Sequence, residues 1–175
     1  MALIPEHWMP NAPMKRIIAH WTAGGYVASS LDKEHYHFLV EGDGTVVRGL
    51  HPISANIPPL REGRYAAHTR SANSYSIGVS ACGMAGATEN PFNPGRYPIS
   101  ERQFGKLAEL IATLAKRYGI PVTDKTILTH AEVQPNLGIK QLGKWDYTRL
   151  VFKPELKGYR EVGDYLRHLV KVAMR

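Results

Sequence analysis

The sequence predicts one α/β domain in which helices flank a mixed central β-sheet. Three observations predict it. The length of 175 residues suits one domain with a sizeable core, the content of 43% hydrophobic and 21% charged residues is that of ordinary globular chains, and short β-rich runs are interspersed with helical patterns. The same composition argues against a disordered or fibrous chain. We expect the single domain to span residues 1–175.

The first half of the chain contains four segments that predict strands. Each is short and rich in β-branched or alternating apolar residues, and each is bounded by proline, glycine or a turn signal. They lie at residues 15–22, on either side of the Asp43-Gly44 hairpin signal within residues 37–49, and at residues 75–82. His20 lies near the end of the first segment. The proline-containing segments 51–64 and 83–98 are expected to be loops.

The second half predicts two helices and one strand. Ser100 begins a helical pattern in capping-box spacing, and Gly119 ends it. Residues 125–129 predict a strand that delivers His130 at its end. Apolar residues at helical spacing predict a closing helix at about 159–174.

Charge is concentrated at the C-terminal end. The net charge is +7, and residues 140–175 hold nine Lys or Arg against four Asp or Glu. Such a basic helix predicts electrostatic contact with an anionic envelope, although solvated cations on an exposed helix explain the same count. No nucleic-acid-binding motif accompanies it, so we expect no nucleic-acid partner. A signal peptide needs a basic start followed by an apolar stretch, and the first residues of this sequence do not show that pattern. We therefore expect synthesis in the cytoplasm without a signal peptide.

Eight histidines make a metal site possible, and their spacing leaves two candidate pairs. His35 and His37 form an H-x-H pair, which would share one face of a strand. His20 and His130 each end a predicted strand, where α/β folds bind ligands. The lone Cys82 excludes a site with several thiolates. Spacing alone does not choose between the pairs, or between either pair and no metal.

Five separated motifs occur in one order: IIAHWTAG at 17–24, HYHFLVEGDGTVVRG at 35–49, AAHTRSANSYSIGVSACG at 66–83, LTHAEVQ at 128–134 and GKWD at 143–146. Together they resemble the motifs of phage-lysozyme-type N-acetylmuramoyl-L-alanine amidases, the family that includes the peptidoglycan recognition proteins. The resemblance runs from residue 15 to about 150.

The resemblance implies a mononuclear zinc hydrolase with its Zn²⁺ site in a groove at the sheet edge. It assigns His20, His130 and Asp146 as metal ligands, Tyr36 and Lys144 as catalytic residues, and His68 as a substrate contact. If Tyr36 faces the metal, strand alternation turns His35 and His37 away. One departure is Ser80, which stands near where some relatives carry a glutamate as general base.

The implied function is hydrolysis of the bond between the lactyl group of N-acetylmuramic acid and L-alanine in peptidoglycan. We expect a phage or prophage endolysin that acts at the cell wall as a monomer. Two alternatives remain at this point. One is a cytoplasmic amidase that recycles soluble muropeptides, and the other is a non-catalytic peptidoglycan-binding module of the same fold.

Overall fold

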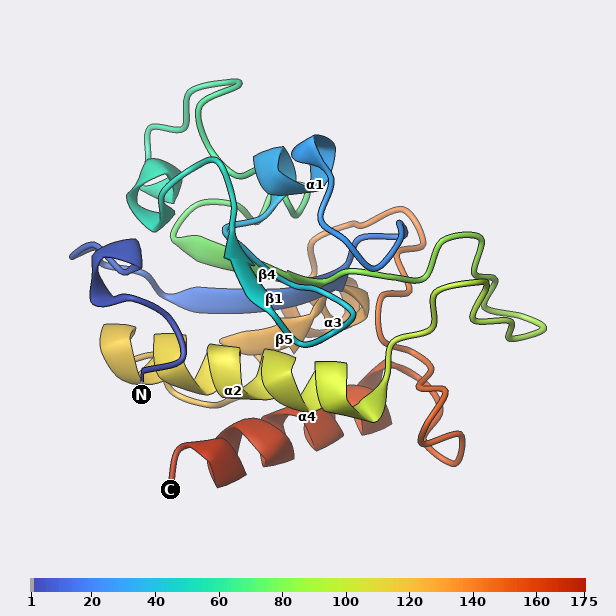
Figure 1. Ribbon diagram of the computed structural model, residues 1–175. Helices are drawn as coiled ribbons and strands as arrows, with labels where there is room; N and C mark the ends of the chain where they lie inside the picture. Colours follow the sequence, from blue (N-terminus) through green and yellow to red (C-terminus); the bar gives the residue numbers. More distant parts are fainter. Residues whose placement is uncertain (1) are drawn as a thin grey trace.

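Five strands form one mixed β-sheet at the centre of the computed structural model, which describes residues 2–175 (Figure 1). The strand order is β3-β2-β4-β1-β5. The strands are β1 (Arg16–Trp21), β2 (Phe38–Val40), β3 (Val46–Arg48), β4 (Ser76–Ala81) and β5 (Ile127–Thr129). The helices are α1 (Ser30–His35), α2 (Glu101–Tyr118), α3 (His130–Leu137) and α4 (Tyr159–Ala173), and two 3₁₀ turns span Glu6–Trp8 and Ile53–Asn56. The predicted α/β class is therefore confirmed.

The central strand β1 pairs in parallel with β4 on one side and β5 on the other. β2 also runs parallel to β4, and only the β2–β3 hairpin at Asp43-Gly44 is antiparallel. Parallel strands are normally covered on both faces. All six residues of β4 and all three of β5 are buried, as this arrangement requires.

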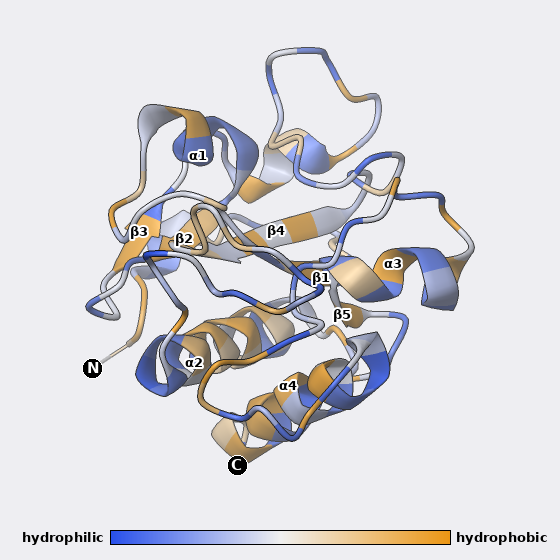
Figure 2. Ribbon diagram, turned by 90° about the vertical axis from the view of Figure 1, so that its right-hand side faces the viewer, coloured by the Kyte–Doolittle hydropathy of each residue, from blue (hydrophilic) through white to orange (hydrophobic). Residues whose placement is uncertain are grey.

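Helices cover the two faces of the sheet unequally. α2 and α4 lie side by side on one face, where they pack on Ile17, Ile77 and Val79 (Figure 1). Figure 2 shows that hydrophobic and hydrophilic residues form separate stripes along both helices, as expected for helices with one buried face. The shorter α3 packs on the opposite face through Val133 against Ile18 of β1. This second face carries the candidate site.

Two short helices, α1 and α3, were not expected from the sequence, and a capping motif begins each of them. Ser29 and Asp32 exchange side-chain to backbone hydrogen bonds of 2.9 and 3.0 Å at the start of α1. At the start of α3, the Glu132 carboxylate accepts a 2.9 Å hydrogen bond from the Thr129 backbone N–H. Both helices therefore begin at a local capping motif. They are only six and eight residues long, which is too short to show a clear apolar period, so the sequence did not predict them.

A buried ion pair fixes α4 to the rest of the domain. The Arg167 guanidinium donates to both carboxylate oxygens of Glu132 at 2.8 and 3.0 Å, to the Ile127 carbonyl at 3.0 Å and to Asp164 at 2.7 Å. The carboxyl group of Glu132 lies against Gly163, where any side chain would clash with it. Arg167 is one of the nine basic residues counted in 140–175, and the expected contact with an anionic envelope included it. It is only 6% exposed, so this part of the expectation is wrong.

Within residues 2–175, none of the helices has the length and apolar character needed to cross a membrane.

Replacing Arg167 with Leu should lower the free energy of unfolding by about 3–5 kcal/mol, because it leaves the Glu132 carboxylate buried without its partner. Urea unfolding followed by circular dichroism measures the change. Lys171→Leu is the matched control, since Lys171 lies on the same helix but is exposed. An equal effect of the two substitutions would show that the ion pair does not anchor α4.

Candidate metal centre

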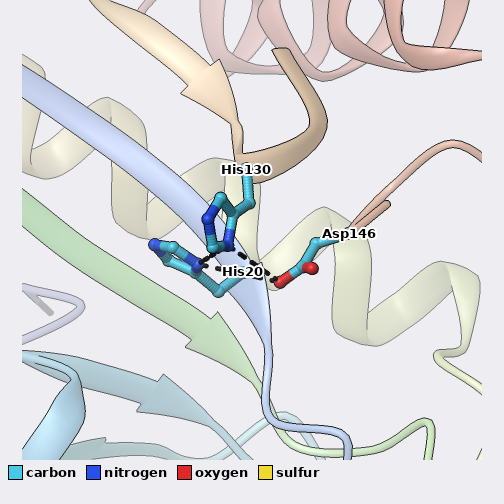
Figure 3. Close-up of side chains that lie close together, drawn as sticks. All are labelled: His20, His130 and Asp146. Atoms are coloured by element: carbon cyan, nitrogen blue, oxygen red, sulfur yellow. Dashed lines mark hydrogen bonds and ion pairs between the residues drawn. The ribbon is translucent and has the colours of Figure 1, made fainter. Parts of the chain in front are cut away.

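Three side chains that are distant in sequence converge at the carboxyl ends of β1 and β5 (Figure 3). His20 lies near the end of β1, and His130 is the first residue of α3, directly after β5. Asp146 comes from the loop between α3 and α4. The β1–β5 register aligns Ala19 with Thr129, so the next residues, His20 and His130, are brought side by side.

The three ligand atoms form a compact triangle. The Nδ1 atoms of His20 and His130 lie 3.0 Å apart, and Oδ2 of Asp146 lies 3.7 and 3.6 Å from them. Tetrahedral zinc with bonds of about 2.0–2.1 Å holds neighbouring ligand atoms at roughly 3.3 Å from one another. Two imidazole nitrogens and one carboxylate oxygen therefore fit one Zn²⁺ ion, and three protein ligands leave a position for water or substrate.

The charge states of these groups also suit a cation. Burial lowers the pKa of His20 to about 4, so its imidazole is neutral at neutral pH. Burial alone would raise the pKa of Asp146, but the adjacent His130 and His20 side chains hold that pKa well below its ordinary value. The carboxylate also accepts a 3.4 Å hydrogen bond from the Trp21 backbone N–H. A neutral imidazole and an ionised carboxylate are the forms that bind metal.

Tyr36 lies at the C-terminal end of α1, and its ring is 5.2 Å from the ring of His20. Burial and the nearby Asp146 carboxylate raise the pKa of its phenol well above the ordinary value. The phenol therefore stays protonated and can donate a hydrogen bond, but it is unsuited to accept a proton as a base. Ser80, aligned with His20 on β4, has a buried hydroxyl without a hydrogen-bond partner among the described residues.

The triangle lies at an open hollow of about 670 Å³. Tyr36, His68, Arg70, Leu142, Lys144 and Trp145 are among the residues that line it. Lys144 and Leu142 are exposed at its rim, and no carboxylate within residues 2–175 pairs with Lys144. The ammonium group is thus available to a bound molecule.

The H-x-H alternative is wrong, because the two side chains make separate hydrogen bonds and do not share a strand face. His35 ends α1 and donates from Nδ1 to the Ala67 carbonyl at 2.9 Å. His37 is buried, where it accepts from the Gly78 N–H and donates to Asn56, both at 3.0 Å. His37 therefore joins β2 to β4 and to the 53–75 segment.

His68 lies behind His20 and is only 7% exposed. Its Nδ1 is 3.2 Å from Nε2 of His20, and its ring packs on Gly78, where a side chain would clash with it. Only a small edge of the ring remains for the substrate contact that the resemblance implied. Two buried neighbours, Thr69 and Gln141, were not among the expected site residues. Thr69 lies within the motif at 66–83, where only His68 was assigned a role, and Gln141 lies between the motifs, where no spacing indicates it.

The sequence matches the family model described as N-acetylmuramoyl-L-alanine amidase over residues 10–146. No curated protein sequence matches. Among solved structures, the chain is similar to the Staphylococcus aureus hydrolase AmiA, crystallised with its ligand, at 15% identity and a TM-score of 0.56, over 92% of this chain and 75% of that one. It is also similar to a mutant of PlyL, at 17% identity and a TM-score of 0.52, over 91% and 85% of the two chains.

At such identities the two structures show a common fold. The family match shows more than the fold, because it is a match of sequence over most of the chain. It includes all five motifs and the three converging side chains. The chain therefore belongs to the N-acetylmuramoyl-L-alanine amidase family.

Proposed function

We propose that this protein is a zinc-dependent amidase that hydrolyses the bond between the lactyl group of N-acetylmuramic acid and L-alanine in peptidoglycan. The observation that carries the proposal is the triangle of His20 Nδ1, His130 Nδ1 and Asp146 Oδ2 beside an open hollow. Its donor set and its distances suit a catalytic zinc with a vacant position. When bound, zinc supplies an activated water molecule at neutral pH.

The protein's own residues would hold the substrate and the water in place. The protonated Tyr36 phenol, close to His20, can donate a hydrogen bond to the attacking water or to the carbonyl of the scissile amide. Lys144 can approach that carbonyl from the rim and stabilise the negative charge that develops on its oxygen. These two roles need no strong protein base, which agrees with Ser80 standing where some relatives carry glutamate.

Hydrolysis accounts for the site better than binding alone. A non-catalytic peptidoglycan-binding module has no need of a third metal ligand or of a cation without a partner, whereas this chain holds both Asp146 and Lys144 at the hollow. We further propose that the protein is a phage or prophage endolysin that acts as a monomer on the cell wall. Activity on soluble anhydro-muropeptides but not on intact sacculi would instead select a muropeptide-recycling enzyme.

The purified protein should contain one zinc per chain by elemental analysis and should release new amino termini from purified cell walls. A chelator should abolish this release, and added zinc should restore it. His20→Ala, His130→Ala and Asp146→Ala should each lose zinc or activity, because each removes one of three ligands. His35→Ala is the matched control, since His35 lines the same hollow but lies outside the triangle. Full activity in zinc-free protein would refute the proposal.

Lys144→Ala should keep its zinc but lose about 100-fold in kcat, the scale of removing one group that stabilises the developing oxyanion. Turnover of a soluble muropeptide, together with zinc content, measures both effects. Lys140→Ala removes an exposed lysine of the same loop and should leave kcat unchanged. If Lys144→Ala keeps wild-type turnover, Lys144 takes no part in the reaction.

We also propose that the basic C-terminal end contacts an anionic envelope. Arg167 is left out of this proposal because it is buried. Lys157, Arg160, Lys171 and Arg175 are exposed, and replacing all four with Gln should slow lysis of whole cells at low salt. The difference should shrink at physiological ionic strength, where exposed charges are screened beyond about 8 Å. Turnover of a soluble muropeptide is the control and should not change. Equal lysis by both proteins at low salt would exclude the contact.

A further inference from the structure

We infer that Gln141 and His68 are positioning residues that fix which ring nitrogen of each metal-binding histidine carries the proton. The inference rests on the proposed zinc site, and it concerns side chains that lie behind the ligands. Both are buried, with Gln141 3% and His68 7% exposed. Each contacts the Nε2 atom of one histidine, on the side of the ring away from the triangle.

Gln141 determines the state of His130. Its side-chain amide nitrogen donates a 2.8 Å hydrogen bond to the Arg70 carbonyl, which can only accept. This bond orients the amide so that its oxygen, Oε1, lies 2.9 Å from Nε2 of His130. Because Oε1 has no proton to donate, Nε2 of His130 must carry one. The Nδ1 atom is then left with its lone pair directed at the triangle.

His68 does the same for His20. Its Nε2 lies 3.3 Å from the Ser76 carbonyl, so that nitrogen carries the proton and Nδ1 is an acceptor. Nδ1 lies 3.2 Å from Nε2 of His20 and 2.8 Å from the Thr69 hydroxyl, which is itself 3.2 Å from Nε2 of His20. Since Nδ1 of His68 can only accept, it needs donors. The N–H at Nε2 of His20 and the Thr69 hydroxyl can both supply one, so every atom of this group has a partner when Nε2 of His20 carries the proton. Its Nδ1 is then also unprotonated.

The consequence is that two unprotonated Nδ1 atoms face each other at 3.0 Å, beside a carboxylate oxygen. Two lone pairs at this distance repel each other unless a cation lies between them. The hydrogen bonds behind the rings therefore build a site complementary to a cation before it arrives. Both bonds are tied to backbone carbonyls of one segment, Arg70 and Ser76, which precedes and begins β4.

A matched pair of variants separates positioning from packing. Gln141→Met and Gln141→Glu both lose the hydrogen bond to the Arg70 carbonyl, but only Glu keeps an oxygen for Nε2 of His130. Competition with a chromogenic chelator should show zinc bound about 10–100-fold more weakly by Gln141→Met, and within about threefold of wild type by Gln141→Glu, the range measured for partners of metal-bound histidines. Equal weakening in both variants would assign Gln141 a structural role only and overturn the inference.

The protonated nitrogen can be read directly from the ¹⁵N chemical shifts of the histidine rings in the metal-free protein. We expect both His20 and His130 to carry the proton on Nε2. Gln141→Met should change this pattern for His130 alone, and the double variant His68→Leu, Thr69→Val should change it for His20 alone. A proton on Nδ1 of either ring in the wild-type protein would overturn the inference. This measurement needs no metal, so failure of wild-type protein to bind zinc would refute the proposed function separately.

Discussion

The parallel pairing of β1 with β5 is the constraint on which the candidate site depends. Ile17, Ile18 and Ala19 align with Ile127, Leu128 and Thr129, and this register brings the two following histidines together. A slip of one residue would turn one imidazole to the opposite face of the sheet, against α2 and α4. The apolar residues of both strands prevent such a slip, because it would also expose or misplace the core. The forces that stabilise the sheet therefore also place the ligands.

The α2 helix and the two histidine-ended strands could be predicted because their signals are local. Ser100 caps α2 through a 3.1 Å bond from the Gln103 N–H, and Gly119 ends it in the left-handed conformation, as the sequence indicates. The choice of metal pair could not be made from spacing, because it depends on which segments become neighbours. His35 belongs to a helix only six residues long, so strand alternation did not apply to it. Asp146 reaches the site from a loop. Its position two residues after Lys144 is equally consistent with a surface ion pair, so its assignment as a metal ligand came from the family resemblance.

The role of a charged residue also depends on which segments become its neighbours in the fold. The sequence places nine cations in residues 140–175, but a count treats each as a surface group. Arg167 instead forms a buried ion pair with Glu132. The Glu132 carboxylate also caps α3 by accepting a hydrogen bond from the Thr129 N–H. One buried carboxylate thus links β5, the helix that begins with His130, and α4. The C-terminal helix therefore helps to hold in place the two elements that carry His130, whatever its exposed residues contact.

The site divides into a rigid part and an open part, and this division suits its chemistry. The ligands are buried, and the groups behind them end on backbone carbonyls, so their orientation is set by the fold and not by solvent. Lys144 and Leu142, by contrast, are exposed at the rim of the hollow. A metal held by these preformed side chains would need no rearrangement at the moment of reaction, which is the condition under which fixed charges stabilise a transition state most effectively.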